Sequence, residues 1–233
     1  MRDKDTQISL HLQIIETLFE KIFGDLVREH YLCAEIIEYD MIRNFIFDLV
    51  GVIADFGTKQ IFQHFIDMGA ADVWELNNEM DLGHLSGEEF LIQIQKRCPG
   101  TTVDQLRAEY LAPMVLPEEH LDLLCQLRKK HRVFLLSNVG DMHWQHLVEE
   151  MSAKGYTVDD CFDAVFPSFK THVNKPDLKA YQNVLLSAGL EPSETIFFDD
   201  SLANVEAAKK LGMRAELVKT AFPNPQLLQL ACF

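Results

Sequence analysis

The sequence has few cysteines, and no spacing that would pair them. There are five in 233 residues, an odd number, and no two stand in a CxxC arrangement. Disulfide-stapled secreted domains and zinc sites need denser or more regular sets. We therefore expect reduced thiols and a cytoplasmic protein. The cysteines are Cys33, Cys98, Cys125, Cys161 and Cys232.

Long hydrophobic runs and a surplus of positive charge are also absent. No apolar stretch approaches the roughly 20 residues that span a bilayer. Charged residues such as Glu16, Glu20 and Lys21 interrupt the segment in which a signal peptide would be apolar. The formal net charge of −15 argues against a nucleic-acid partner, because phosphate backbones are bound by lysine and arginine. The sequence thus predicts neither membrane insertion nor nucleic-acid binding.

Short apolar segments are present at residues 42–50 and, in alternation with helical patterns, after Pro117. Continuously apolar strands separated by helices are typical of a parallel sheet that is covered on both faces. The predicted fold class is therefore α/β. The predicted strands are 42–50, 132–137, 164–168, 195–200 and 215–218, and the predicted helices between them are 118–130, 142–154, 176–189 and 204–211.

Two other segments show helical patterns without strands. Residues 58–115 predict three or four short helices, one of them beginning at a capping box of Ser86 and Glu89. An apolar stripe over residues 6–39 predicts an N-terminal helical extension, 1–41. The extension has three interpretations: helices packed on the core, a segment for homodimerisation or partner docking through residues 1–40, or a coding start assigned too early.

Charged and polar side chains end three of the predicted strands. They are Asp48, the pair Ser137-Asn138, and the pair Asp199-Asp200; Lys175 stands in a loop before Pro176. The carboxyl ends of parallel strands converge at one edge of a sheet. Three carboxylates there would repel one another without a cation, and a hard divalent ion such as Mg²⁺ prefers oxygen ligands. Lys175 and the Ser137 hydroxyl are suited to phosphoryl oxygens.

Four segments together resemble the ordered motifs of the haloacid dehalogenase superfamily: IFDLVGVIAD, VFLLSN, NKPD and IFFDDSLANVEAAKKLGM. The resemblance covers residues 42–220. It implies a Rossmann-like core, 42–57 and 116–233, with an inserted helical cap, 58–115. The segment DLGHLSGEEF is similar to a cap segment of the sugar-phosphate phosphatase branch, such as bacterial α-glucose-1-phosphatase.

The resemblance also implies roles for the residues at the strand ends. Asp48 is expected to attack phosphorus and form an aspartyl-phosphate. Ser137, Asn138 and Lys175 are expected to bind the phosphoryl group. Mg²⁺ is expected to be bound by Asp48, Asp199, Asp200 and the main-chain carbonyl of Val50. The implied function is a Mg²⁺-dependent phosphatase of a small phosphorylated metabolite, with sugar phosphates as candidates.

The sequence departs from the family pattern at Val50. Phosphatases of this superfamily usually carry a second aspartate there, which acts as general acid and base. General acid–base catalysis typically contributes about 10²–10⁴-fold, so we expect slow turnover unless another group substitutes. Asp55 is a candidate substitute, although a surface turn explains it equally well. The alternatives are a binding or regulatory protein with impaired catalysis and a metal-independent dehalogenase, against which Asp199-Asp200 counts.

Other side chains receive simpler interpretations. His143 and His146 lie three residues apart, which is expected of a helix face rather than a metal site. His172 stands where related sequences often have glycine, which predicts a reshaped loop before Lys175. Four aromatic residues of 58–115 are expected to form the core of the cap, with lining of the substrate pocket by one or two of them as the alternative: Phe62, Phe65, Trp74 and Phe90.

Overall fold

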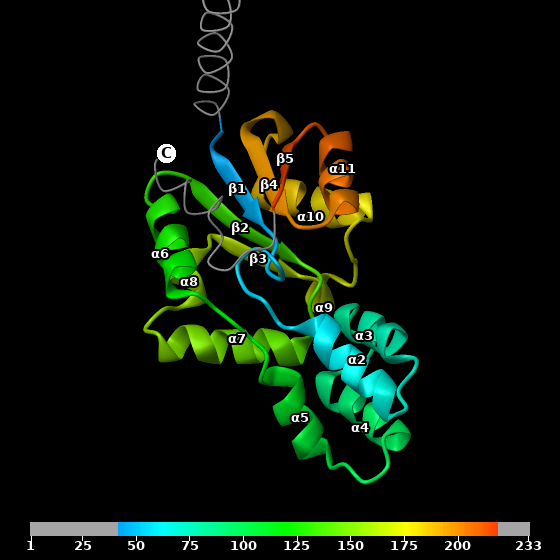
Figure 1. Ribbon diagram of the computed structural model, residues 1–233. Coiled ribbons are helices and arrows are strands. Elements are labelled where there is room, and N and C mark those ends of the chain that lie inside the picture. Colours follow the sequence, from blue (N-terminus) through cyan, green and yellow to red (C-terminus); the bar gives the residue numbers. More distant parts are fainter. Residues whose placement is uncertain (1–41, 219–233) are drawn as a thin grey trace, which may run out of the picture. The chain divides into compact units, whose positions relative to one another are not determined.

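A five-stranded parallel sheet forms the centre of the computed structural model, which describes residues 42–218 (Figure 1). The predicted extension 1–41, with its dimerisation or docking role, and residues 219–233 lie outside the described residues. The strand order is β3-β2-β1-β4-β5. The strands are β1 (Asn44–Phe47), β2 (Arg132–Ser137), β3 (Ala164–Pro167), β4 (Thr195–Asp199) and β5 (Arg214–Leu217).

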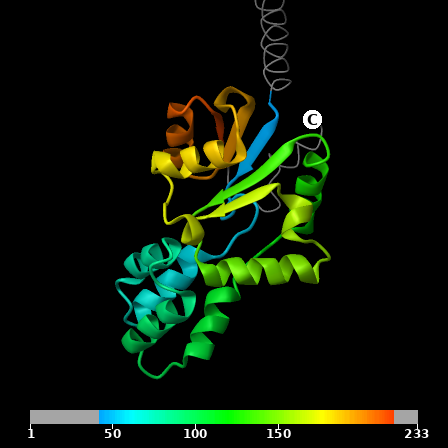
Figure 2. The ribbon, with the colours of Figure 1, turned by 180° about the vertical axis from the view of Figure 1, so that it is seen from behind.

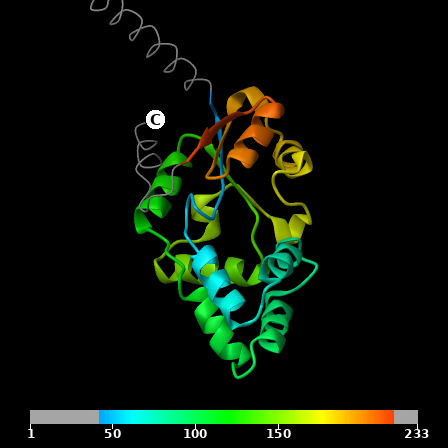
Figure 3. The ribbon, with the colours of Figure 1, turned by 45° about the vertical axis from the view of Figure 1, so that its right-hand side comes forward.

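Helices cover both faces of this sheet, as the continuously apolar strands predict. Figure 3 shows α6 on one side of the sheet and α10 and α11 on the other. On the α10–α11 side, Ile46 and Phe134 pack with Tyr181 and Val205 in one buried cluster. The helices are α6 (Glu118–Leu127), α7 (Asp141–Ala153), α8 (Val158–Cys161), α9 (Ser168–Thr171), α10 (Leu178–Ala188) and α11 (Leu202–Lys210), with a 3₁₀ turn at Pro192–Glu194.

Four helices stand between β1 and α6 and gather beyond the carboxyl end of the sheet (Figure 2). The capping box is confirmed, because the Ser86 side chain accepts from the Glu89 N–H and the Glu89 carboxylate accepts from the Ser86 N–H. These helices bury an apolar cluster of their own. They are α2 (Thr58–Met68), α3 (Val73–Asp81), α4 (Gly87–Arg97) and α5 (Val103–Leu111).

Two local predictions are wrong. Trp74 does not belong to the buried core, since 52% of it is exposed while its ring meets Phe62 edge to face. Helix α10 begins at Leu178 instead of Pro176. Its cap is Asp177, whose carboxylate accepts a hydrogen bond from the Lys179 N–H at 2.9 Å. A side chain that satisfies a free N–H fixes the start of the helix there.

None of the helices between residues 42 and 218 has the length and hydropathy needed to cross a bilayer.

Candidate active site

The registers of the sheet bring the polar strand ends together. Strand β1 lies between β2 and β4, and its last residue, Phe47, pairs with Leu135 on one side and Phe198 on the other. Asp48 therefore follows β1 at the level where Asp199 ends β4, with Ser137 close to the same level on β2. The predicted convergence of these residues at one edge of the sheet agrees with the structure.

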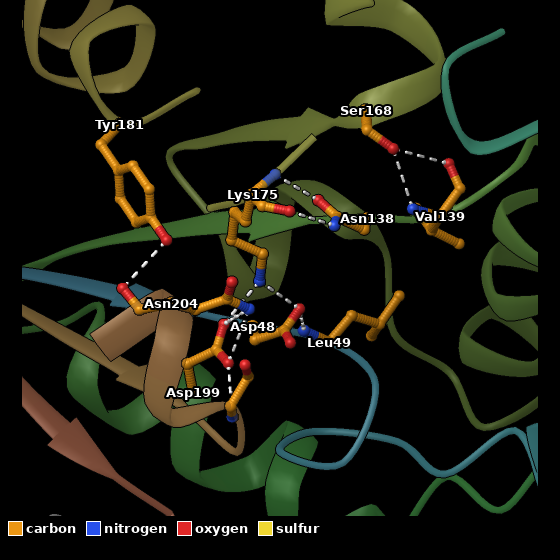
Figure 4. A network of polar contacts seen from close by, with 10 residues as sticks. Asp48, Leu49, Asn138, Val139, Ser168, Lys175, Tyr181, Asp199 and Asn204 are labelled. Atoms are coloured by element: carbon orange, nitrogen blue, oxygen red, sulfur yellow. Dashed lines mark hydrogen bonds and ion pairs between the residues drawn. The ribbon is translucent and has the colours of Figure 1, made fainter. Parts of the chain in front are cut away.

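Lys175 lies between two of the carboxylates (Figure 4). Its Nζ is 2.8 Å from Asp48 Oδ1 and 2.7 Å from Asp199 Oδ2, and all three side chains are buried. Burial alone would lower the pKa of Lys175, but the two carboxylates raise it above its ordinary value. The ammonium therefore stays charged and ties the ends of two strands to the loop before α10.

The Asp48 carboxylate is held at one oxygen. Its Oδ1 accepts hydrogen bonds from Lys175 and from the Leu49 N–H, the latter at 2.6 Å. No hydrogen bond among residues 42–218 reaches Oδ2. Burial raises the pKa of Asp48 to about 7, although Lys175 acts in the opposite direction. Two donors orient this carboxylate, and its other oxygen is free to react. An additional positive charge nearby would stabilise its ionised form.

Asp199 is fixed by a residue that the sequence did not single out, Asn204. The Asn204 amide donates to both oxygens of Asp199, at 3.0 and 3.1 Å, and the Ser201 N–H donates to Oδ1 at 2.8 Å. The carbonyl of Asn204 in turn accepts from the Tyr181 hydroxyl at 3.0 Å. The available signal was the amide in the first turn of the helix that follows the acid pair.

Asp48, Asp199 and Asp200 form the one group in the described chain whose carboxylates are placed for a metal ion. One oxygen of each lies within 4.8 Å of the others. Burial, and then the neighbouring Asp199, raise the pKa of Asp200. His143 and His146 belong to no such group within residues 42–218. The donor set consists of hard oxygen ligands, which suits Mg²⁺.

The turn after Asp48 approaches the Asp200 side chain closely. Gly51 has φ +83°, and a Cβ at this position would lie 2.4 Å from Asp200 Oδ2. Val50 precedes it and is half-buried, with a side chain that cannot transfer a proton. A glycine is thus required here for the Asp200 carboxylate to stand beside the turn.

The Ser137 hydroxyl is buried and has no hydrogen-bond partner among residues 42–218. A buried hydroxyl without a partner is costly. A phosphoryl oxygen at the edge of the sheet would satisfy it, and Lys175 would neutralise its charge. The residues present therefore fit a phosphate group together with a hard cation.

The Asn138 side chain contacts the backbone of Lys175. Its Nδ2 donates to the Lys175 carbonyl at 2.9 Å, and its Oδ1 accepts from the Lys175 N–H at 2.8 Å. Both functional groups of the amide are used by the backbone of one residue. The structure thus makes Asn138 a support for the Lys175 loop.

Asp55 and His172, the substitute proton donor and the loop residue singled out in the sequence, have partners outside the carboxylate cluster. Asp55 is exposed, its carboxylate accepts from the Gly57 N–H at 2.9 Å, and its backbone pairs with Val115. His172 adopts a left-handed backbone, φ 57°, and its ring nitrogen lies 2.8 Å from the Leu82 carbonyl. His172 therefore links the loop before Lys175 to the end of α3.

Most of the described chain is similar to known hydrolases. Residues 42–212 match the family model described as haloacid dehalogenase-like hydrolase. The chain belongs to this family of hydrolases. It is 30% identical over 185 residues to the D-ribitol-5-phosphate phosphatase of Bacteroides thetaiotaomicron, covering 74% of this chain and 89% of that one.

Solved structures of the family are similar as well. A HAD family enzyme from Bacteroides thetaiotaomicron, in complex with magnesium and inorganic phosphate, is 28% identical with a TM-score of 0.70, over 77% of this chain and 96% of that one. A predicted HAD-like family hydrolase from Porphyromonas gingivalis is 28% identical with a TM-score of 0.65, over 78% and 93%. The Rossmann-like core implied by the four motifs is confirmed.

Proposed function

We propose that this chain is a Mg²⁺-dependent phosphatase of a small sugar or polyol phosphate, which acts through an aspartyl-phosphate on Asp48. The observation that carries the proposal is the contact of Lys175 with both Asp48 and Asp199. The Ser137 hydroxyl, which has no hydrogen-bond partner among residues 42–218, adds to it. The similarity to a D-ribitol-5-phosphate phosphatase and to a structure with magnesium and phosphate supports it.

Two steps account for the reaction. Asp48 Oδ2 attacks phosphorus, the ester P–O bond breaks, and the alcohol oxygen leaves with the bonding electrons. Water then attacks the aspartyl-phosphate and releases inorganic phosphate and free Asp48. Lys175 and Ser137 hold the phosphoryl oxygens in both steps, and the Leu49 N–H keeps the attacking carboxylate oriented.

Asp48, Asp199, Asp200 and the Val50 carbonyl would hold the metal ion. When bound, Mg²⁺ would offset the repulsion among the carboxylates and between them and the phosphoryl group. Asn204 contributes indirectly, because it keeps Asp199 in place through both carboxylate oxygens.

The side chain of Val50 cannot supply the proton that an alkoxide leaving group needs. Asp55 was the candidate, but its carboxylate is exposed and bonded to the Gly57 N–H. We therefore infer a slow enzyme for alkyl phosphates. Activated esters, whose leaving groups depart without protonation, should be the better substrates.

The domain assignment forms part of the proposal. Helices α2–α5, within residues 58–115, would act as a cap on the core formed by 42–57 and the chain from residue 116. His172 supports this arrangement, because it joins the cap at Leu82 to the loop that carries Lys175. The cytoplasmic location inferred from the cysteines stays a prediction.

Phosphate release from D-ribitol 5-phosphate and p-nitrophenyl phosphate tests the function. We expect hydrolysis with Mg²⁺, no hydrolysis with a chelator, and none by Asp48→Asn. Asp55→Asn is the control and should keep its activity. Activity that survives both the chelator and Asp48→Asn would refute the proposal. Binding of Mg²⁺ and phosphate without any turnover would favour the regulatory alternative.

A further inference from the structure

Two free thiols face each other away from the polar strand ends. Cys125 lies on α6 and Cys161 is the last residue of α8. Their sulfur atoms are 3.7 Å apart, although the residues are 36 positions apart in the sequence. The two helices lie side by side in both Figure 1 and Figure 2. This contact has no part in the proposed phosphatase chemistry.

The two sulfur atoms differ in accessibility. Cys125 is half-buried and lines an open cavity of about 520 Å³, together with Arg128, Lys129 and Tyr156. Cys161 lies behind it and is fully buried. A small molecule in the cavity can therefore reach Cys125, whereas Cys161 does not line the cavity.

We propose that Cys125 and Cys161 form a modification site, at which a small-molecule disulfide oxidises the thiol pair to an intramolecular disulfide. The Cys125 thiolate attacks one sulfur of the small disulfide, which forms a mixed disulfide and expels one thiolate. Cys161 then loses its proton to water and attacks the Cys125 sulfur, which expels the second thiolate. Two electrons pass from the protein thiols to the small disulfide, which is reduced to two thiols.

The order of the steps follows from burial. Burial, and then the adjacent Cys125 sulfur, raise the pKa of the Cys161 thiol. A thiol that ionises poorly is a poor first nucleophile. Cys161 instead acts as the resolving thiol, next to a sulfur that has already been activated.

The bond requires only a local movement. An S–S bond is about 2.05 Å long, so the sulfur atoms must approach by about 1.7 Å from their present 3.7 Å. Helix α8 has only four residues, which lets Cys161 shift without moving a long element. Arg128 keeps α8 close, since it donates to the Asp159 carbonyl and lies 3.3 Å from the Asp163 carboxylate.

The closed loop would contain strand β2 and helix α7. A cross-link over 36 residues restricts the unfolded chain. We expect the oxidised protein to unfold at a temperature about 5–10 °C higher than the reduced protein.

The experiment treats the full chain with oxidised glutathione, blocks the remaining thiols with N-ethylmaleimide, and maps the peptides by mass spectrometry. We expect a cross-linked peptide that joins Cys125 to Cys161. Cys161→Ser should stop at a glutathione adduct on Cys125, and Cys125→Ser should leave Cys161 free. Cys98→Ser changes another buried cysteine and should still form the cross-link.

Three results would overturn the proposal. Both thiols of the wild type could remain open to alkylation, the glutathione adduct on Cys125 could persist, or the cross-link could join a different cysteine. The wild-type measurement requires no variant to fold. An unfolding temperature that is the same with and without the cross-link would contradict the expected stabilisation.

Discussion

Val50 is the residue that most distinguishes this site from a complete acid–base phosphatase site. Val50 stands two residues after Asp48, where the family usually has an aspartate, but its side chain has no ionisable group. The consequence falls on the leaving group, because an alkoxide departs slowly without a proton. The sequence alone exposed this difference, since the motif around Asp48 is otherwise intact.

Val50→Asp should restore the proton donor. We expect kcat to rise by up to about 10²–10⁴-fold for D-ribitol 5-phosphate, and by much less for p-nitrophenyl phosphate, which has a better leaving group. Steady-state kinetics with both substrates measures the difference. If the folded Val50→Asp protein shows no gain in kcat and Asp55→Asn loses activity, Asp55 already acts as the proton donor.

Gly51 provides a second test at a single residue. Gly51→Ala should weaken Mg²⁺ binding at least about 10-fold, because the new methyl group meets Asp200 Oδ2 at 2.4 Å. Calorimetric titration with Mg²⁺ measures the affinity. Gly100→Ala is the matched control, since Gly100 also has positive φ, +94°, but no atom within 4 Å of the added carbon. Equal losses of Mg²⁺ affinity in both variants would mean that backbone strain, and not the contact with Asp200, causes the effect.

Among the elements, the strands were the most predictable. Apolar runs bounded by polar residues defined all five strands, and the rule that ligands bind at the carboxyl ends placed Asp48, Ser137 and Asp199 together. The partner of the Asn138 amide was not predictable, because its hydrogen bonds reach Lys175, which lies 37 positions away in the sequence. Asn204 lies only five positions from its partner Asp199, so its place in the first turn of α11 was a local signal. The start of α10 was missed because Asp177 competes with Pro176 as the helix signal.

The loop that carries Lys175 is held by Asn138, which follows the end of β2. Asn138→Ala removes both hydrogen bonds to the Lys175 backbone and should lower kcat about 10–100-fold, since about 1–3 kcal/mol of positioning is lost. Kinetics with p-nitrophenyl phosphate and hydrogen exchange of the Lys175 amide measure the effect. Asn174→Ala, in the same loop, removes one exposed bond to Asn78 and should leave the exchange of that amide little changed. Unchanged exchange in Asn138→Ala would contradict the role.

For the whole molecule, His143 makes stability depend on pH. It is buried between the rings of Phe56 and Tyr110, with centroids 4.4 and 4.1 Å away. Burial lowers the pKa of His143 from 6.5 to about 4. Between these values the unfolded chain binds more protons than the folded one, so the stability that His143 contributes falls as pH decreases. The full effect is about 3 kcal/mol.

The matching measurement is the free energy of unfolding of the wild type minus that of His143→Gln, at pH 7 and pH 4.5. We expect the difference to shrink by about 2–3 kcal/mol at the lower pH. Taking a difference is necessary because burial raises the pKa values of Asp48 and Asp81 to about 7, which acts in the opposite direction. His64→Gln, at an exposed site, should show no such change. A constant difference for His143→Gln would contradict the assignment.

Asp48 is proposed to carry the phosphoryl group, while Val50 supplies no proton-transferring side chain beside it. Acid quenching during turnover of p-nitrophenyl phosphate, followed by peptide mass mapping, tests it most directly. We predict a Mg²⁺-dependent phosphoryl group on Asp48 in the wild type, and much less in Val50→Asp, in which the restored carboxylate would activate water. Turnover without any phosphoryl group on Asp48 would contradict this role. So would an equal amount of protein-bound phosphoryl group in Asp48→Asn.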